Sequence, residues 1–180
     1  MAFCVIMYRS DIMVSNPAKK EAWEKLKKLG VDKLWKLTLD EITKAYSEFI
    51  EGKSKCNIVV LISERDYFHE FYECFLKPSF PDDIAHFMVV SGYYLRKYSK
   101  EIKQRMIFLE NGLWWLTALP KSRAYKARLI RDLFQAAVEN GKFLILCSKG
   151  LNVLSFRDLL PSAYSGEPIP EIKDIELKFP

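Results

Sequence analysis

The region from residue 106 to residue 156 constrains the fold more than any other part of the sequence. It begins with two apolar runs, 106–110 and 113–119, joined by Asn111-Gly112. This dipeptide is the strongest short-range signal for a β-hairpin, because both of its residues tolerate a positive φ. We therefore predict a hairpin here.

A helix and a second hairpin are predicted to follow. Ser122 can cap a helix that runs to residue 140, where Gly141 ends it. The apolar runs 142–147 and 151–156 then flank a turn at Lys149-Gly150. The whole region is therefore expected to form a hairpin, a basic helix and a second hairpin.

The chain before this region alternates between strand and helix signals. Asn16-Pro17 is a typical helix start, and Thr38 with Glu41 forms the pattern of a capping box. In chain order we predict strands at 3–8 and 11–14, a helix at 18–29, a helix from Thr38 that Gly52 ends, a strand at 57–62, a helix from Ser63 to Leu76, and a strand at 84–98 with a bulge or turn at Ser91-Gly92.

These elements predict a mixed α/β fold of the α+β class. At 180 residues the chain can form one domain or two small lobes. We expect an N-terminal α/β lobe over 1–77, and a C-terminal lobe over 78–160 with the hairpin-helix-hairpin core of restriction-endonuclease-like folds. The tail, 161–180, has no assigned role.

Sequence motifs for metal or nucleotide binding are missing. The chain lacks the spacings typical of zinc sites and has no glycine-rich phosphate loop. His69 lies among aromatic residues, where a histidine is more often structural than catalytic. We interpret Cys4, Cys56, Cys74 and Cys147 as small apolar residues, and we expect no metal and no cofactor.

The net charge is +5, and basic residues cluster at the start of the 122–140 helix. Cations are disfavoured at a helix N-terminus by about 0.3–1 kcal/mol each, so an anion there would compensate the cost. A bound phosphate and salt bridges to acidic residues elsewhere are both consistent with the pattern. The candidate RNA-binding residues are Lys121, Arg123, Lys126, Arg128 and Arg131.

The order and length of these elements resemble those of a tRNA splicing endonuclease subunit. The resemblance rests on the Asn16-Pro17 helix, the helix that contains residues 37–42, and the basic helix with its flanking runs. It extends over roughly 3–160. It implies metal-independent RNA cleavage by a tyrosine, a histidine and a lysine in catalytic members of the family.

In this chain the corresponding positions do not hold that triad. Asn111 falls where the histidine is expected, and Phe108 lies near the tyrosine position. Lys142 matches the lysine only if the register slips by one residue. The resemblance therefore implies a non-catalytic structural subunit with no catalytic residues of its own, as in heteromeric archaeal enzymes.

The resemblance also implies partners. The family assembles two catalytic with two structural chains, and the substrate is pre-tRNA in the cytoplasm, with no membrane involved. The loop 148–152 lacks the acidic residues that the family uses in assembly. Pairing of last strands makes Leu151, Val153, Leu154 and Phe156 the candidate subunit-interface residues.

Two alternatives remain open. One is a stand-alone nucleic-acid-binding protein on a decayed nuclease fold, which would bind through the basic helix. The other is an active ribonuclease that uses His69 or His86 as its acid or base.

Overall fold

One all-parallel sheet organises the part of the chain that the computed structural model describes, residues 17–180. Its strand order is β2-β3-β4-β1-β5. The strands are β1 (Ile58–Ser63), β2 (Ile84–Phe87), β3 (Met106–Leu109), β4 (Phe143–Lys149) and β5 (Ile172–Glu176). The expected mixed α/β class is confirmed. The strands predicted at 3–8 and 11–14 lie outside the described residues.

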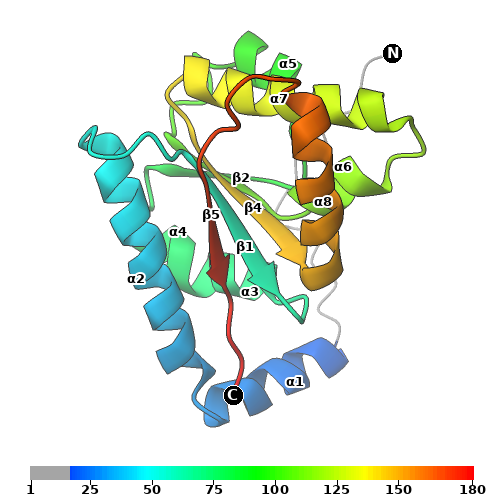
Figure 1. Cartoon of the computed structure of the whole chain (residues 1–180). Helices are drawn as coiled ribbons and strands as arrows, with labels where there is room; N and C mark the ends of the chain where they lie inside the picture. The colour runs from blue at the N-terminus through cyan, green and yellow to red at the C-terminus, as the bar shows by residue number, and fades with distance from the viewer. Residues whose placement is uncertain (1–16) are drawn as a thin grey trace.

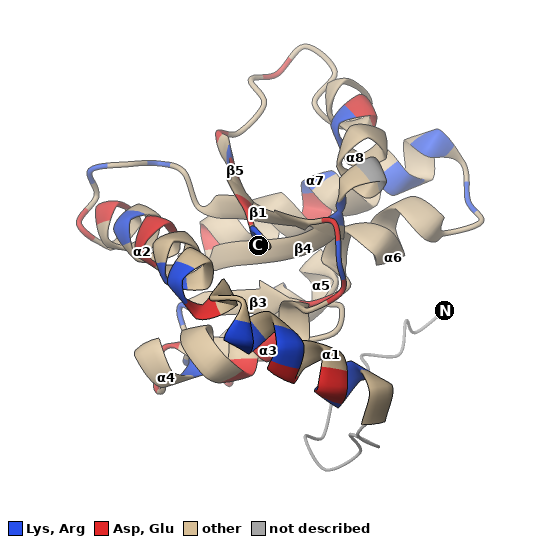
Figure 2. Cartoon of the chain, turned by 90° about the horizontal axis from the view of Figure 1, so that it is seen from below, with Lys and Arg blue, Asp and Glu red and all other residues tan. Residues whose placement is uncertain are grey.

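Helices cover both faces of the sheet, as Figures 1 and 2 show. One face packs against the first group of helices, the other against the second, and each interface is a buried apolar cluster. The first group is α1 (Pro17–Lys28), α2 (Val31–Ile50), α3 (Phe68–Phe71) and the π-helix η1 (Tyr72–Leu76), which α4 (Lys77–Ser79) follows. The second group is α5 (Gly92–Lys97), α6 (Gly112–Ala118), α7 (Arg123–Glu139) and α8 (Gly150–Ala163).

The strands are apolar on both faces because both faces are covered. Residues 58–61, 106–109 and 143–147 are buried without interruption. Such continuous runs are typical of parallel strands, whereas the hairpins of an antiparallel sheet usually alternate apolar and polar residues.

The first predicted hairpin is wrong. β3 pairs in parallel with β2 and β4, and residues 112–118 form α6. Asn111 and Gly112 both keep a negative φ, so no hairpin turn forms there. The glycine is needed for space instead: a Cβ on Gly112 would lie 3.1 Å from Leu109 Cβ and 3.2 Å from Leu146 Cδ2.

The second predicted hairpin is also wrong, because residues 151–156 belong to α8. Val153 and Phe156 are buried and Leu154 is exposed. Burial at positions three apart is the period of a helix. The predicted 84–98 strand is likewise only β2, and its second half is α5, which Ser91 caps by accepting from the Tyr94 amide.

Several local predictions are confirmed. α1 begins at Pro17, β1 occupies the predicted strand, and α7 begins after Ser122, whose hydroxyl accepts from the Tyr125 amide. The capping box at Thr38 is wrong, since α2 already begins at Val31. Thr38 lies inside α2 and donates to Glu176 O at 3.0 Å, which joins α2 to β5.

The three expected segments share one sheet. β1 lies within 1–77, β4 within 78–160 and β5 within 161–180, and β1 pairs with both of the others. The tail thus supplies an edge strand.

Candidate functional site

A polar crevice lies at the carboxyl ends of β1, β3 and β4. In Figure 1 the arrowheads of β1 and β4 point to the same edge of the sheet, and α8 starts beside the tip of β4. The crevice measures about 360 Å³, within the range of small-molecule sites. Its walls are formed by Asp66, Phe68, Glu110, Asn111, Trp114, Cys147, Ser148, Lys149 and Asn152.

The sheet topology explains why the crevice opens here. After β1 the chain turns to the face covered by α3, whereas after the neighbouring strand β4 it turns to the face covered by α8. Adjacent parallel strands whose connections leave toward opposite faces form a topological switch point, which is where open α/β sheets bind their ligands.

The N-terminus of α8 faces this crevice. β4 ends at Lys149 and α8 begins at Gly150, so no loop separates them. The N-cap residue, Lys149, makes no side-chain hydrogen bond to the helix, and the first turn holds no acidic residue. The amides of the first turn can donate hydrogen bonds to an anion, and the exposed Lys149 adds a positive charge beside them.

Two histidines and a glutamate meet beside the crevice. Glu110 Oε2 lies 2.7 Å from His86 Nε2 and 3.3 Å from His69 Nδ1. Since a carboxylate can only accept, both ring nitrogens donate. The three side chains are only 12–14% exposed, and they come from α3, β2 and the residue after β3.

These contacts set the protonation of the cluster. Burial acts to raise the pKa of the Glu110 carboxyl, but the hydrogen bonds from His69 and His86 outweigh it and lower this pKa to about 2. The hydrogen bond to Glu110 also raises the pKa of His69 against the effect of burial. Glu110 is therefore an anion at neutral pH, and protonation of His69 is favoured.

Aromatic rings hold the cluster in place. The ring of Tyr72 lies 4.4 Å from that of His86 and 5.2 Å from that of Phe108, measured between centroids. Tyr72 begins the π-helix that directly follows α3 and His69. Single-turn π-helical segments are frequent at functional sites.

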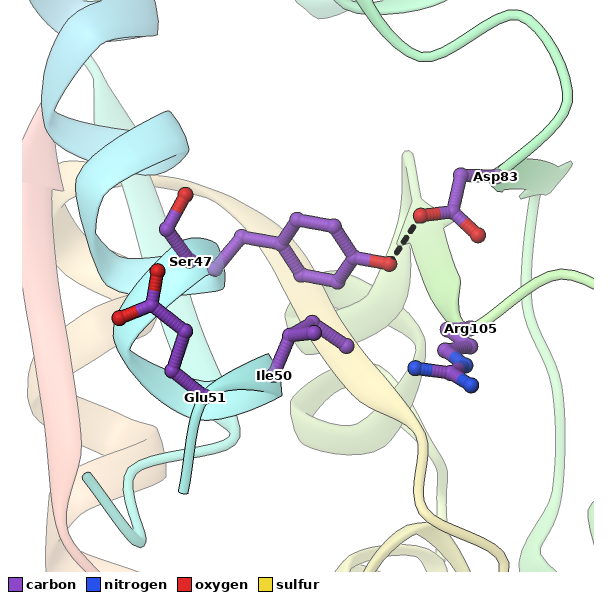
Figure 3. A pocket seen from close by; sticks show the side chains of 6 residues that line it. Ser47, Ile50, Glu51, Asp83 and Arg105 are labelled. Atoms are coloured by element: carbon purple, nitrogen blue, oxygen red, sulfur yellow. Dashed lines mark hydrogen bonds between the residues drawn. The ribbon is translucent and has the colours of Figure 1, made fainter. Parts of the chain in front are cut away.

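A second pocket, of about 370 Å³, lies at the opposite edge of the sheet. Figure 3 shows its wall, where the Tyr46 hydroxyl donates to Asp83 and Arg105 lies nearby. Burial, and next the bond to Asp83, raise the pKa of Tyr46, which keeps the phenol protonated. Two of its polar groups thus satisfy each other.

The positions given by the family resemblance are separated by the fold. Lys142 precedes β4 at the amino edge and donates to Ile102 O at 2.6 Å and Gln104 O at 2.8 Å. Burial lowers its pKa. Asn111 follows β3 at the carboxyl edge. Given the register of β3 with β4, Lys142 and Asn111 lie about six residues apart along the strands, roughly 20 Å.

The predicted basic cluster lies at the start of α7 and in the turn before it, where Figure 2 shows lysine and arginine positions. Arg131 Nη2 donates to both carboxylate oxygens of Glu167, at 2.7 and 2.8 Å, so the salt-bridge interpretation holds for this residue. The Arg128 guanidinium lies 5.4 Å from the Tyr125 ring centroid.

The other candidates of this cluster differ in their contacts. Arg123 donates to Asp158 O, and Lys126 Nζ donates to Thr117 O at 2.8 Å. Lys121 is exposed. Three of the five candidates line one groove of about 480 Å³ between α7 and the end of α8: Arg123, Arg128 and Arg131.

The predicted interface residues do not form one surface. Val153 and Phe156 lie in the core between α8 and the sheet, whereas Leu154 is 65% exposed. The side chain of Leu151 is outside the described part of the structure.

Sequence reasoning missed the histidine and glutamate cluster. Glu110 is 24 residues from His86 and 41 from His69, so no short motif joins them. The sequence holds only a weak signal for this cluster: His86 belongs to a strand, and Glu110 directly follows an apolar run.

Comparison of the chain with protein-family models, with curated proteins and with solved structures gave no match. Within residues 17–180, none of the helices combines the length and the apolar character needed to cross a bilayer.

Proposed function

We propose that the chain binds a small anionic ligand, of the size and chemistry of a mononucleotide, in the crevice at the carboxyl edge. The observation that carries this proposal is the position of the crevice over the switch point between β1 and β4, with the uncapped start of α8 at its wall.

The crevice offers a partner for each part of such a ligand. The α8 amides and Lys149 suit a phosphate, which helix N-termini and cations bind. Trp114 lines the crevice although its side chain is 58% exposed, so a planar base can stack on it. Asp66, at the end of β1, can accept hydrogen bonds from hydroxyl groups.

Trp114 also provides the measurement. Titration with adenosine monophosphate is expected to change the tryptophan fluorescence in a saturable way, and Trp114→Phe should abolish the change. Lys149→Gln should weaken the affinity about tenfold, because it removes a charge-assisted hydrogen bond. Lys100→Gln is the matched control, since Lys100 is an exposed lysine in the turn before β3. Inorganic phosphate, the second probe, should bind more weakly.

Three results would refute the proposal: no saturable change with either probe at millimolar concentration, a change that persists in Trp114→Phe, or equal affinities of the two lysine variants.

A second candidate function is binding of nucleic acid along α7. The groove that Arg123, Arg128 and Arg131 line favours it, because guanidinium groups in one groove can contact successive phosphates, with Arg131 exchanging Glu167 for a phosphate. Binding to RNA should weaken with salt and fall in the triple variant with all three arginines changed to glutamine. The same affinity in that variant would exclude this groove.

The assignment to a non-catalytic subunit of a tRNA splicing endonuclease, with pre-tRNA and a catalytic chain as partners, stays a prediction. Its support is the sequence resemblance and the basic start of α7. Co-expression with a catalytic subunit tests it: the chain should co-purify and be required for cleavage of an intron-containing pre-tRNA.

A further inference from the structure

His69, His86 and Glu110 form a cluster with the composition of a metal site. One carboxylate oxygen contacts two imidazole nitrogens from separate elements. All three potential ligand atoms lie within 4.8 Å of one another. Two imidazole nitrogens and one carboxylate oxygen are a common ligand set for first-row divalent metals.

We propose that His69, His86 and Glu110 bind a divalent transition metal ion, with Zn²⁺ as the representative probe. The inference does not depend on the anionic ligand proposed above.

The observed spacing suits such an ion. When each donor atom is about 2.0 Å from a tetrahedral Zn²⁺, two donors lie about 3.3 Å apart. The distance from His69 Nδ1 to Glu110 Oε2 is 3.3 Å, and that from His86 Nε2 is 2.7 Å. Small shifts of the side chains would therefore complete the geometry. The ion would replace the protons on the two ring nitrogens, and these protons would be released.

The surroundings favour a cation. Glu70 directly follows His69 in α3, whereas the Glu73 carboxylate already pairs with Lys77 at 3.0 Å. Glu70 Oε2 is buried and lacks a hydrogen-bond partner in the described part of the chain, although Glu70 Oε1 pairs with Lys19 at 3.1 Å. One buried carboxylate oxygen on the residue next to His69 is therefore left to interact with a cation.

The site is also partly preorganised. His86 belongs to β2, and its neighbour across the sheet is Phe108 of β3, so two of the ligands are attached to paired strands. The Tyr72 ring packs on His86. Three protein ligands leave a coordination position for water or substrate, as in catalytic zinc sites. Because Glu110 also lines the crevice, the metal would lie at the crevice wall.

The test uses the untagged chain, because His69 and His86 are its only two histidines. After treatment with a chelator, calorimetric titration should show one equivalent of Zn²⁺ with a dissociation constant of about 1 μM or below. His86→Gln and Glu110→Gln should each weaken binding at least about 100-fold. Two controls should retain it: Glu73→Gln, which removes a carboxylate that already pairs with Lys77, and Cys74→Ser, which removes an exposed thiol.

A second measurement needs no variant. In the NMR spectrum of the wild-type chain, the ring signals of both histidines should shift together on addition of one equivalent of Zn²⁺. Signals that stay in place, wild-type binding weaker than about 1 mM, or full binding by a folded His86→Gln variant would overturn the proposal. Titrations with adenosine monophosphate in excess chelator keep this outcome separate from that of the ligand proposal.

Discussion

The two edges of the sheet use polar residues in different ways. At the amino edge, Tyr46 donates to Asp83 and the buried Lys142 donates to two backbone carbonyls. At the carboxyl edge, the N-cap residue of α8, Lys149, makes no capping hydrogen bond, and Glu110 lies between two imidazoles at the wall of a crevice. Both edges have pockets of similar size.

The difference follows from topology. The connections after β1 and β4 diverge to opposite faces of the sheet, so the described segments leave a crevice between them, with the start of α8 at its wall. We therefore infer that polar groups at the amino edge stabilise the fold, whereas those at the carboxyl edge serve binding.

The largest expected effect concerns α8, which forms a wall of the carboxyl edge. Phe156→Ala should reduce the free energy of unfolding by about 3–5 kcal/mol, because its ring is fully buried in the core. Leu154→Ala should change it by less than about 0.5 kcal/mol, because Leu154 is exposed. Urea unfolding of both variants measures this. Equal costs would indicate that residues 151–156 do not form the described helix.

Glu110→Gln should reduce the free energy of unfolding by about 3 kcal/mol at pH 6 in the presence of a chelator. The reason is that the pKa of the Glu110 carboxyl lies well below the ordinary 4.5. For this depressed pKa, the stabilisation is present above pH 4.5 and is lost as the pH falls toward 2. His69 has the opposite sign: its pKa is raised, so its contribution is complete below about pH 6.5 and is lost as the pH rises through the raised value.

Thermal or urea unfolding across the pH range tests this. The difference in free energy of unfolding between wild type and Glu110→Gln should be largest between pH 4.5 and about pH 6.5. A difference that does not vary with pH would show that the carboxylate charge is not what the histidines stabilise.

Tyr46→Phe probes the amino edge and should destabilise the fold less than Phe156→Ala or Glu110→Gln. Loss of the hydrogen bond to Asp83 should reduce the free energy of unfolding by about 1–2 kcal/mol. Affinities for adenosine monophosphate and Zn²⁺ should not change. A weakened affinity in a fully folded variant would contradict the division between the two edges.

The sequence predicts those elements whose signals are local. Ser122 and Gly141 correctly bound α7, because a cap and a positive-φ glycine act within one turn of the helix. The prediction from Asn111-Gly112 was wrong for the same reason, because its preference for a hairpin is local. Burial of both faces of the sheet favours parallel pairing instead, and the glycine is explained by close packing on Leu109 and Leu146.

Sequence patterns could not predict the candidate site. In a parallel sheet, residues at the ends of different strands meet at one edge, and the helices between them set no fixed spacing. His69, His86 and Glu110 therefore carry no motif. The sequence shows the basic residues of α7. It does not show that Arg131 pairs with Glu167 of the same chain.

The most direct test of the central claim is a crystal structure of the chain grown with adenosine monophosphate. We expect density for the phosphate at the first turn of α8, beside Lys149, and for the base against Trp114. Density in the amino-edge pocket between Tyr46 and Arg105, with the carboxyl-edge crevice empty, would contradict the account.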